Sequence, residues 1–530
     1  MLVVLIIVAG AILSCAKTEE FKAPDTPTIT ESNITIGKVI LGKKLENPYS
    51  VDNMRRAYSS LPTQTRSEAG DLEINPTHLY VKFTPSTSEE LDLLKSDTTL
   101  ILFPYPLDYE IISGKEDNIF IDLSFENGHP VPHYASVEID KQLPDNIAYE
   151  ILEKLFIPDD YSDDAVQVIT RSGDVLREAF IESLVDKAME ITGNLNEDNQ
   201  HSDVTRASAW RPAGKITYYD EYKGAILGVE GIKVKANRWF TTHTGFVNAA
   251  GNYSCDGTFK RPADYSFDFE REDFWIKDMK LSKNNVTGNW NYHMVRGVGE
   301  IAVPGLGGKT PSPYTYSVLF RAAYDYSYKN VYGLVRPPES QVFRAKIKIK
   351  PVNKTDNSVN GVFNTGWFSG LTAKDIEIYN HTDTIQNLYA TTIHELTHSA
   401  HWRMNRELFI HYTQLIVKES WARGVELYLT RLVYPNYSTP GGYSRMDYTG
   451  IVQDLIDPAG LQKTSYRHSN YDIKSEKTYT DNVSGYTLKQ IETALEGAWS
   501  WEIWRENLKI MYQNPTESHI DAAFAYWKSI

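Results

Sequence analysis

Over residues 71–205, hydrophobic residues recur at every second position in some segments and at helical spacing in others. This mixture predicts an α+β domain. Hydrophobic and polar residues alternate in His78–Phe83, and Asn118–Leu123 shares this period of two, so both segments are predicted strands. Hydrophobic residues recur at helical spacing in Val175–Ile191, and Ser88 is placed to cap a short helix that follows it. No cluster of catalytic residue types occurs in this domain.

A β segment is predicted next, over residues 206–273. Alternation is clear in Gly214–Tyr218, Ile232–Ala236 and Tyr253–Phe259, and a turn containing Gly251 and Asn252 precedes the last of these.

The remaining residues, 274–530, are predicted to form one larger domain. Its first part contains a helix at Ser317–Tyr328, strands at Val342–Ile349 and Asp375–Tyr379, and a Gly- and Asn-rich surface loop at Val359–Gly370. The rest is mostly helical, with a loop rich in Gly and Tyr at Pro435–Thr449. The predicted helices are Thr384–Asn405, Gln414–Val433, Leu488–Trp504, which opens with a Thr487/Gln490 capping box, and Glu517–Trp527.

The N-terminal residues predict a signal peptide over 1–15 and a polar tether over 16–70. Leu2–Leu13 is wholly apolar but shorter than the ~20 residues that span a bilayer, as expected for a signal-peptide core. The tether is rich in Thr, Pro, Ser and Asn, and Ser50–Tyr58 within it is expected to form a short amphipathic helix. The sequence therefore predicts a multidomain protein, with an α+β domain, a β segment and an α+β domain whose C-terminal half is helical.

Charge and cysteine content narrow the function classes. The net charge of −15 and the pI of about 5.4 argue against nucleic-acid binding and against attraction to an anionic membrane surface. Cys15 and Cys255 are the two cysteines of the chain. If Cys15 is lipidated, Cys255 is unpaired and no disulfide framework forms.

The stretch with the clearest chemistry is His394-Glu395-Leu396-Thr397-His398, an HExxH motif inside a predicted helix. Residues i and i+4 lie on one face of a helix, so both imidazoles point toward one position that a Zn²⁺ ion can occupy. Glu395 lies ~100° further round the helix. It is therefore placed to take a proton from a zinc-bound water.

A third protein ligand is expected from the chain beyond the motif, and three residues are candidates. The next helix carries Glu419 and Glu426 on one stripe, and His401 returns to the face of His394. Three ligand side chains on one straight helix would diverge and not close a tetrahedral site, which argues against His401 as the third ligand. Small Ser420 and Ala422 permit close helix approach at Glu419, so we expect Glu419 on the metal and Glu426 farther away, or as a hydrogen-bond acceptor for a ligand imidazole.

The motif and its surroundings resemble the zincin metallopeptidases, and Glu419-Ser420-Trp421-Ala422 resembles the segment that carries the third ligand in gluzincins. Lys418 stands where that family has Asn. The metzincin pattern is absent, since His401 and Met404 occupy the places of its Gly and His. The resemblance implies that Asp375–Tyr379 is an edge strand lining a cleft. It also implies a Tyr or His that stabilises the oxyanion, for which the candidates are Tyr434, Tyr443, Tyr448 and His468.

Two further resemblances concern location and the β segment. Ile12-Leu13-Ser14-Cys15 resembles a lipobox, and the following Lys17, Glu19 and Glu20 resemble a bacterial surface-export signal. The strand order over residues 206–273 is similar to the transthyretin-like carboxypeptidase regulatory-like domain, which implies a small β-sandwich. These resemblances imply an extracytoplasmic lipoprotein of the outer membrane or cell surface, held to the membrane by lipid at Cys15.

Together these features predict a lipid-anchored, zinc-dependent metallopeptidase that hydrolyses protein or peptide substrates through a zinc-bound water. His394, His398 and Glu419 are the expected ligands and Glu395 the catalytic base. The alternative is a catalytically inactive surface-binding lipoprotein on a zincin scaffold.

The lipid anchor gives the first testable prediction. Cys15→Ala should abolish incorporation of a fatty-acid probe into the protein in cells, because the thiol is the expected site of acylation. Cys255→Ala is the matched control and should label like the wild type. Unchanged labelling of Cys15→Ala would exclude a lipoprotein.

Overall fold

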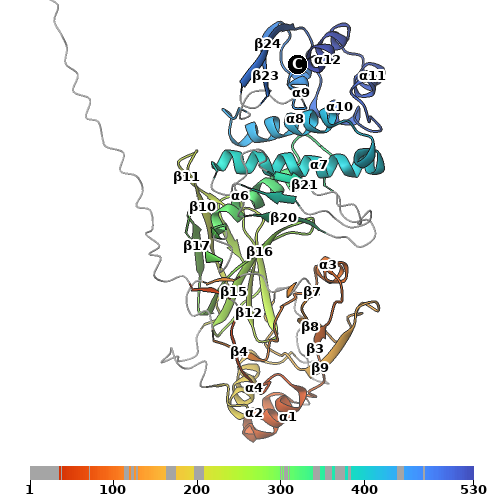
Figure 1. Cartoon of the computed structure of the whole chain (residues 1–530). Coiled ribbons are helices and arrows are strands. Elements are labelled where there is room, and N and C mark those ends of the chain that lie inside the picture. Colours follow the sequence, from red (N-terminus) through yellow and green to blue (C-terminus); the bar gives the residue numbers. More distant parts are fainter. Residues whose placement is uncertain are drawn as a thin grey trace, which may run out of the picture. The chain divides into compact units, whose positions relative to one another are not determined.

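A computed structural model describes most of residues 35–529 (Figure 1). The residues outside the description are 1–34, 38, 71, 113–117, 121–124, 127–128, 163–174, 196–207, 299, 301, 304–307, 310, 338–345, 353–360, 364–375, 380–382, 439–446, 470–471 and 530. The predicted signal peptide and lipobox therefore lie outside the described residues. By their contacts, Ile34–Ile530 form one compact unit.

A three-stranded antiparallel sheet, in the order β8-β3-β9, forms the first predicted domain's centre. Its strands are β3 (His78–Phe83), β8 (His133–Glu138) and β9 (Tyr149–Leu155). The predicted strand at His78–Phe83 is thus present, and the predicted helix follows as α3 (Ser88–Ser96). The residue that caps α3 is Thr87, whose hydroxyl accepts a hydrogen bond from the Glu90 amide.

Helices α1 (Val51–Ser60) and α4 (Glu178–Ile191) pack together beside this sheet. Met54 of α1 and Leu184 of α4 are fully buried in a shared hydrophobic cluster. Residues of the predicted tether therefore contribute to a core, because the amphipathic pattern of α1 gives it an apolar face to bury. Short elements nearby are β2 (Leu41–Lys44), α2 (Thr63–Glu68), β4 (Tyr109–Ile111), β6 (Phe125–Glu126) and β7 (His129–Pro130).

The largest sheet has nine strands and extends through much of the chain. Its main path is β13 (Thr241–Phe246), β12 (Lys233–Arg238), β15 (Ala263–Glu270), β16 (Phe274–Val286), β20 (Ile347–Pro351), β22 (Ile376–Ile378) and β21 (Gly361–Phe363), and β1 (Thr35–Gly37) and β5 (Asn118–Phe120) join at β16. The antiparallel pair β15/β16 crosses the boundary predicted at residue 273, so strands from both predicted segments share one sheet.

A second sheet of four strands packs against the same core. Its strands are β10 (Ala213–Asp220), β11 (Ala225–Gly228), β14 (Asn252–Ser254) and β17 (Trp290–Met294). The ring centroids of Trp290 and of Phe267 from the large sheet lie 5.4 Å apart. Two short strands, β18 (Ala302–Val303) and β19 (Gly308–Lys309), form a separate pair.

The strand predicted at the edge of the sheet is an interior strand, so that prediction is wrong. β22, which corresponds to Asp375–Tyr379, pairs with β20 on one side and with β21 on the other. On this side of the sheet the terminal described strand is β21, which lies within the segment predicted as a surface loop. Its three residues are too few to show a hydrophobic alternation, so the sequence carried no signal for it.

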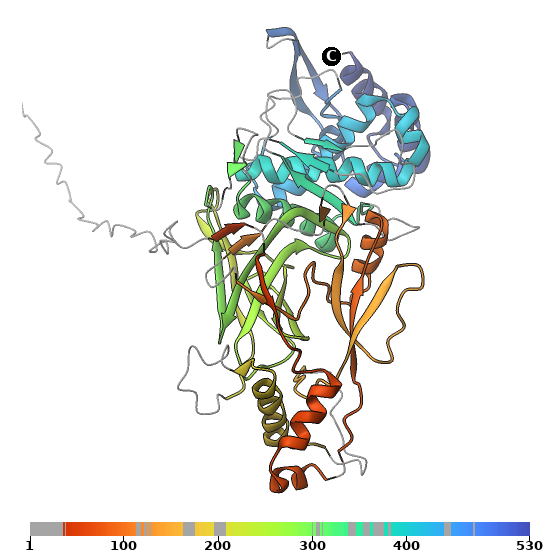
Figure 2. The same cartoon turned by 60° about the horizontal axis from the view of Figure 1, so that its bottom comes forward.

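The C-terminal half is mostly helical, as predicted. Its main helices are α6 (Pro313–Tyr324), which continues as the π-helix η3 (Asp325–Lys329), α7 (Ile385–His411), α8 (Leu415–Val433), α9 (Ile451–Ile456), α10 (Leu488–Thr493), α11 (Trp501–Met511), the short η4 (Glu517–His519) and α12 (Ile520–Lys528). A hairpin not predicted from the sequence, β23 (Leu461–Ser469) and β24 (Asp472–Asp481), interrupts them. Figures 1 and 2 show α6 in green and the helices from α7 onward in cyan to blue. The predicted α+β class with a helical C-terminal half is confirmed.

The helix predicted over Leu488–Trp504 is two helices, and this boundary is corrected. Thr487 and Gln490 form the predicted capping box at the start of α10. Gly497 then has a positive φ of 73°, a conformation that ends a helix, and Ser500 caps α11 by accepting from the Ile503 amide.

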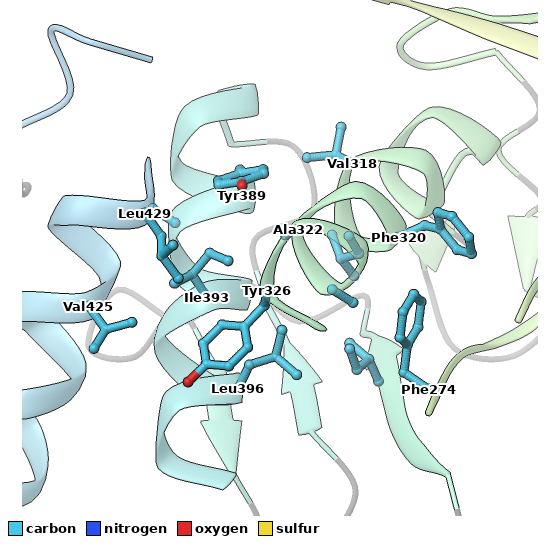
Figure 3. Packing of buried hydrophobic residues seen from close by; sticks show 14 of the residues in the cluster. Phe274, Val318, Phe320, Ala322, Tyr326, Tyr389, Ile393, Leu396, Val425 and Leu429 are labelled. Carbon is cyan, nitrogen blue, oxygen red and sulfur yellow. The ribbon is translucent and has the colours of Figure 1, made fainter. Parts of the chain in front are cut away.

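Helix α7 lies between α6 and α8, and its apolar side chains fix its position (Figure 3). Ile393 and Leu396 of α7 pack among Val318 and Ala322 of α6 and Val425 of α8. Each buried aliphatic side chain contributes roughly 1.5–3 kcal/mol, so this packing can hold polar groups buried on the same helices. In the described part of the chain, no helix is long and apolar enough to cross a membrane.

Helices α8 and α9 pack closely at Gly424 of α8. A Cβ there would lie 2.3 Å from Val452 Cγ1 of α9. Helix propensity alone would favour Ala by about 1 kcal/mol, but overpacking costs about 1–3 kcal/mol. We expect Gly424→Ala to lower the melting temperature, whereas Leu432→Ala at an exposed position of α8 changes it little. A higher melting temperature for Gly424→Ala would contradict this expectation. It would mean that Val452 of α9 shifts at little cost to make room for the added methyl group.

Candidate metal centre

The HExxH motif lies within α7, as predicted, and both of its histidines are buried. Thr384 caps the helix by accepting a hydrogen bond from the Asn387 amide at 3.3 Å, and the motif begins well inside the regular helix. The Nε2 atoms of His394 and His398 lie 3.1 Å apart. The helix alone therefore brings the two imidazoles to one point.

Helix α8 packs against α7 and brings Glu419 to the same point. Glu419 Oε2 lies 3.2 Å from His394 Nε2 and 3.4 Å from His398 Nε2. In a tetrahedral site with bonds of ~2.0–2.1 Å, neighbouring ligand atoms lie about 3.3–3.4 Å apart. The three atoms thus have the spacing of ligands to one metal ion, and among the described residues they form the only potential metal-binding group that includes histidine.

Glu426 supports His394 from the side opposite Glu419. Its Oε2 lies 2.9 Å from His394 Nδ1, and its Oε1 accepts a hydrogen bond of 2.5 Å from the Tyr437 hydroxyl. An Arg423 guanidinium nitrogen lies 3.8 Å from the same carboxylate. With Nδ1–H donating to Glu426, the Nε2 lone pair of His394 is directed toward Glu419 and His398, which suits a metal ligand.

The electrostatics of the group depend on burial and on the close pairs. Burial lowers the pKa of His394, but hydrogen bonds to Glu419 and Glu426 outweigh it and raise that pKa to about 10. Burial opposes ionisation of Glu419, yet His398 and hydrogen bonds from both imidazoles hold its pKa well below the usual range. Glu419 is therefore ionised, as a metal ligand must be, and metal uptake would displace a proton from His394.

Glu395 lies between the histidines and the edge strand β21. A Cβ on Gly361 would come within 2.9 Å of the Glu395 Cγ, so the strand approaches this side chain closely. Burial and the nearby Glu419 raise the pKa of Glu395, although the two imidazoles act in the opposite direction. The Phe363 backbone also forms a hydrogen bond with this carboxyl. A buried carboxyl with a raised pKa is suited to accept and return a proton near neutral pH.

The other predicted candidates take different places. His401 is buried, and its Nε2 lies 3.1 Å from the Asn405 amide nitrogen, apart from the three-atom group. Tyr434 is also buried, and its hydroxyl bonds to Asp220, so it does not face the centre. Tyr448 stacks on His394, with ring centroids 5.9 Å apart. Tyr443 and the His468 side chain lie outside the described residues.

Sequence reasoning missed two parts of the centre. The Tyr437 partner of Glu426 lies in the turn after α8 and carries no sequence signal. The approach of β21 to Glu395 was missed because that segment reads as a loop, and only the absence of a side chain at Gly361 hints at a close contact.

Two substitutions separate the metal ligand from its neighbour. Glu419→Ala removes a ligand atom from the group, whereas Glu426→Ala removes only the acceptor that orients His394. Loss of such an orienting group typically costs about 10–100-fold in metal affinity. We expect a larger loss for Glu419→Ala, measured as the zinc dissociation constant by competition with a chromogenic chelator. A larger effect of Glu426→Ala would exclude Glu419 as the third ligand.

Comparison with known proteins adds no family assignment. No family model, no curated protein and no solved structure matches this chain. The HExxH motif and the geometry of His394, His398 and Glu419 are therefore the features that point to a function.

Proposed function

We propose that this protein is a zinc-dependent metallohydrolase of gluzincin type that cleaves peptide bonds. The observation that carries the proposal is the triangle of His394 Nε2, His398 Nε2 and Glu419 Oε2, with edges of 3.1–3.4 Å. Two imidazoles and one carboxylate are a donor set of catalytic zinc sites, which leave the fourth position open. Zinc bound there supplies Lewis acidity, which polarises a carbonyl group and lowers the pKa of water.

Glu395 is the proposed general base. Its carboxylate receives a proton from the attacking water and transfers it to the nitrogen of the leaving amine. The burial that raises the pKa of Glu395 strengthens it as a base and keeps the returned proton available. Glu426, held by Tyr437, accepts from Nδ1 of His394 and so orients the ring with Nε2 toward Glu419 and His398.

The substrate is proposed to lie along β21. In the described part of the chain, no strand pairs with its outer side, and its Gly361 lies against Glu395. An extended peptide can add to such an edge through main-chain hydrogen bonds, which would bring a scissile bond close to Glu395. Of the predicted oxyanion-stabilising residues, Tyr448 is the one we assign, because its ring lies against His394.

The proposed location is outside the cytoplasm, at the outer membrane or cell surface, with a lipid anchor at Cys15. Its support is the apolar run Leu2–Leu13 and the lipobox-like residues Ile12–Cys15. A protein placed there would act on protein or peptide substrates that reach the surface.

The decisive experiment substitutes the proposed base. Glu395→Gln should retain zinc at the wild-type stoichiometry and lower the turnover of casein or a peptide library by roughly 10²–10⁴-fold, the usual contribution of acid–base catalysis. Zinc content is measured by mass spectrometry and cleavage by peptide identification. Loss of zinc together with activity would make Glu395 structural rather than catalytic.

Controls separate the enzyme from a binding protein on the same scaffold. Chelator should abolish cleavage by the wild type, and added zinc should restore it. His401→Gln is a matched control for a buried histidine of α7 that lies outside the three-atom group. If the zinc-loaded wild type cleaves nothing but binds peptides equally well with and without Glu395→Gln, the protein is a binding module.

A further inference from the structure

A second candidate site lies in the β-rich part of the chain and shares no residue with the metal centre. It is a cavity of about 220 Å³ beside β4 and the ends of β12, β15 and β16, in the region that the labels β4 and β12 mark in Figure 1. At ~30 Å³ for each water molecule of the liquid, this volume equals roughly seven waters. The cavity therefore has room for a small ligand of the size of one sugar ring.

One turn in the cavity wall has a strained backbone, and neighbouring aromatic rings hold its Trp239 side chain in place. β12 and β13 are joined by the two-residue turn Trp239–Phe240, and Trp239 has a positive φ of 51°. Such turns favour Gly, Asn or Asp at positions with positive φ, and a bulky side chain is disfavoured there. Packing on Tyr49 and Phe240 holds the indole, which also lines the cavity.

A second residue with left-handed backbone lines the same cavity. Asn285 has φ 57°, and its backbone N–H donates to Asp264 Oδ1 at 2.7 Å. Of the four described non-glycine residues with positive φ, two, Trp239 and Asn285, are in this wall, and a third, Asn330, ends a helix. Strained residues persist where the surroundings hold them, and they cluster at ligand sites.

The polar lining offers hydrogen-bond donors and acceptors together with little net charge. An asparagine side chain carries both amide donors and a carbonyl acceptor, and four asparagines line the cavity, namely Asn194, Asn237, Asn284 and Asn285. The side-chain amide of Asn194 donates within the protein, to the Glu46 carbonyl and the Thr192 hydroxyl. The charged lining residues are Arg238, Asp264 and Glu110. Asn237 uses its oxygen to accept from Thr242, and its amide nitrogen has no further hydrogen-bond partner among the described residues.

A nearby cavity shows a different chemistry. That cavity, of about 110 Å³, is lined by six basic and four acidic side chains, including Lys233, Lys235 and Glu270. An anionic ligand would suit it better than the asparagine-rich cavity, which no lysine lines.

We propose that the asparagine-rich cavity binds a neutral sugar unit of a glycan. Hydroxyl groups of a sugar donate and accept hydrogen bonds at once, which asparagine side chains match. The apolar C–H face of a sugar ring packs on an aromatic ring, and Trp239, Tyr105 and Tyr109 supply such rings here. The site does not depend on metal, so it adds recognition of glycosylated material to the proposed peptidase.

The test uses the full chain and a panel of free neutral sugars, namely glucose, galactose, mannose, fucose and N-acetylglucosamine. Binding is measured by saturation-transfer NMR and titration calorimetry, with and without chelator. We expect at least one sugar to bind and chelator to leave its affinity unchanged. If no sugar of the panel binds, or if chelator abolishes binding, the proposal is overturned, whatever the outcome for peptide cleavage.

Two substitutions remove side chains that line the cavity and introduce residues that tolerate the local backbone conformation. Trp239→Asn and Asn285→Gly both place a residue that tolerates positive φ in the strained position, so the hairpin should still form. Each should weaken sugar binding by about tenfold or more. Trp499→Ala, at an exposed tryptophan outside the cavity, is the control and should bind like the wild type. Wild-type affinity in Trp239→Asn would overturn the assignment.

Discussion

The contact between α7 and α8 buries carboxylates against imidazoles, and the candidate centre depends on this interaction. Glu419 and Glu426 approach His394 from two sides, and Glu419 also contacts His398. An unpaired buried carboxylate costs several kcal/mol, so neither acid would be stable here without these partners. Three carboxyl groups, including Glu395, surround the histidines, whereas Arg423 is the guanidinium that contacts Glu426. A divalent cation bound at this group would take the place of the proton that His394 otherwise carries.

The geometry of this contact is maintained by the packing on the other side of α7. Apolar residues of α6, α7 and α8 share one core, which fixes the helices in register. A polar network also orients α7. Tyr389 of α7 donates a hydrogen bond to Asp325, and Arg321 pairs with both Asp325 and Asp220 of β10. Buried networks of this kind specify one arrangement because each unmet hydrogen bond is costly. The second sheet is thereby connected to the helix that carries the motif.

The two candidate sites use the large sheet in different ways. β21 provides an edge with main-chain groups beside Glu395, which suits an extended chain. The asparagine-rich cavity lies where β12, β15 and β16 end, and asparagine and aromatic residues line it.

The sequence by itself determined the local geometry of the candidate centre. Spacing of i and i+4 on a helix brings His394 and His398 together whatever the rest of the chain does, and the Thr487/Gln490 box set the start of α10 in the same local way. The small Ser420 and Ala422 favoured Glu419 over Glu426 from the sequence, but both acids occupy one stripe of α8, so the position of α7 along that stripe fixes which carboxylate reaches both imidazoles. It also decided the edge of the sheet, since β21 forms by pairing with β22 and not from any hydrophobic period of its own. The hairpin across residue 273 and the break at Gly497 are local features. The strained Trp239 turn also depends on packing against Tyr49, which lies far away in the sequence.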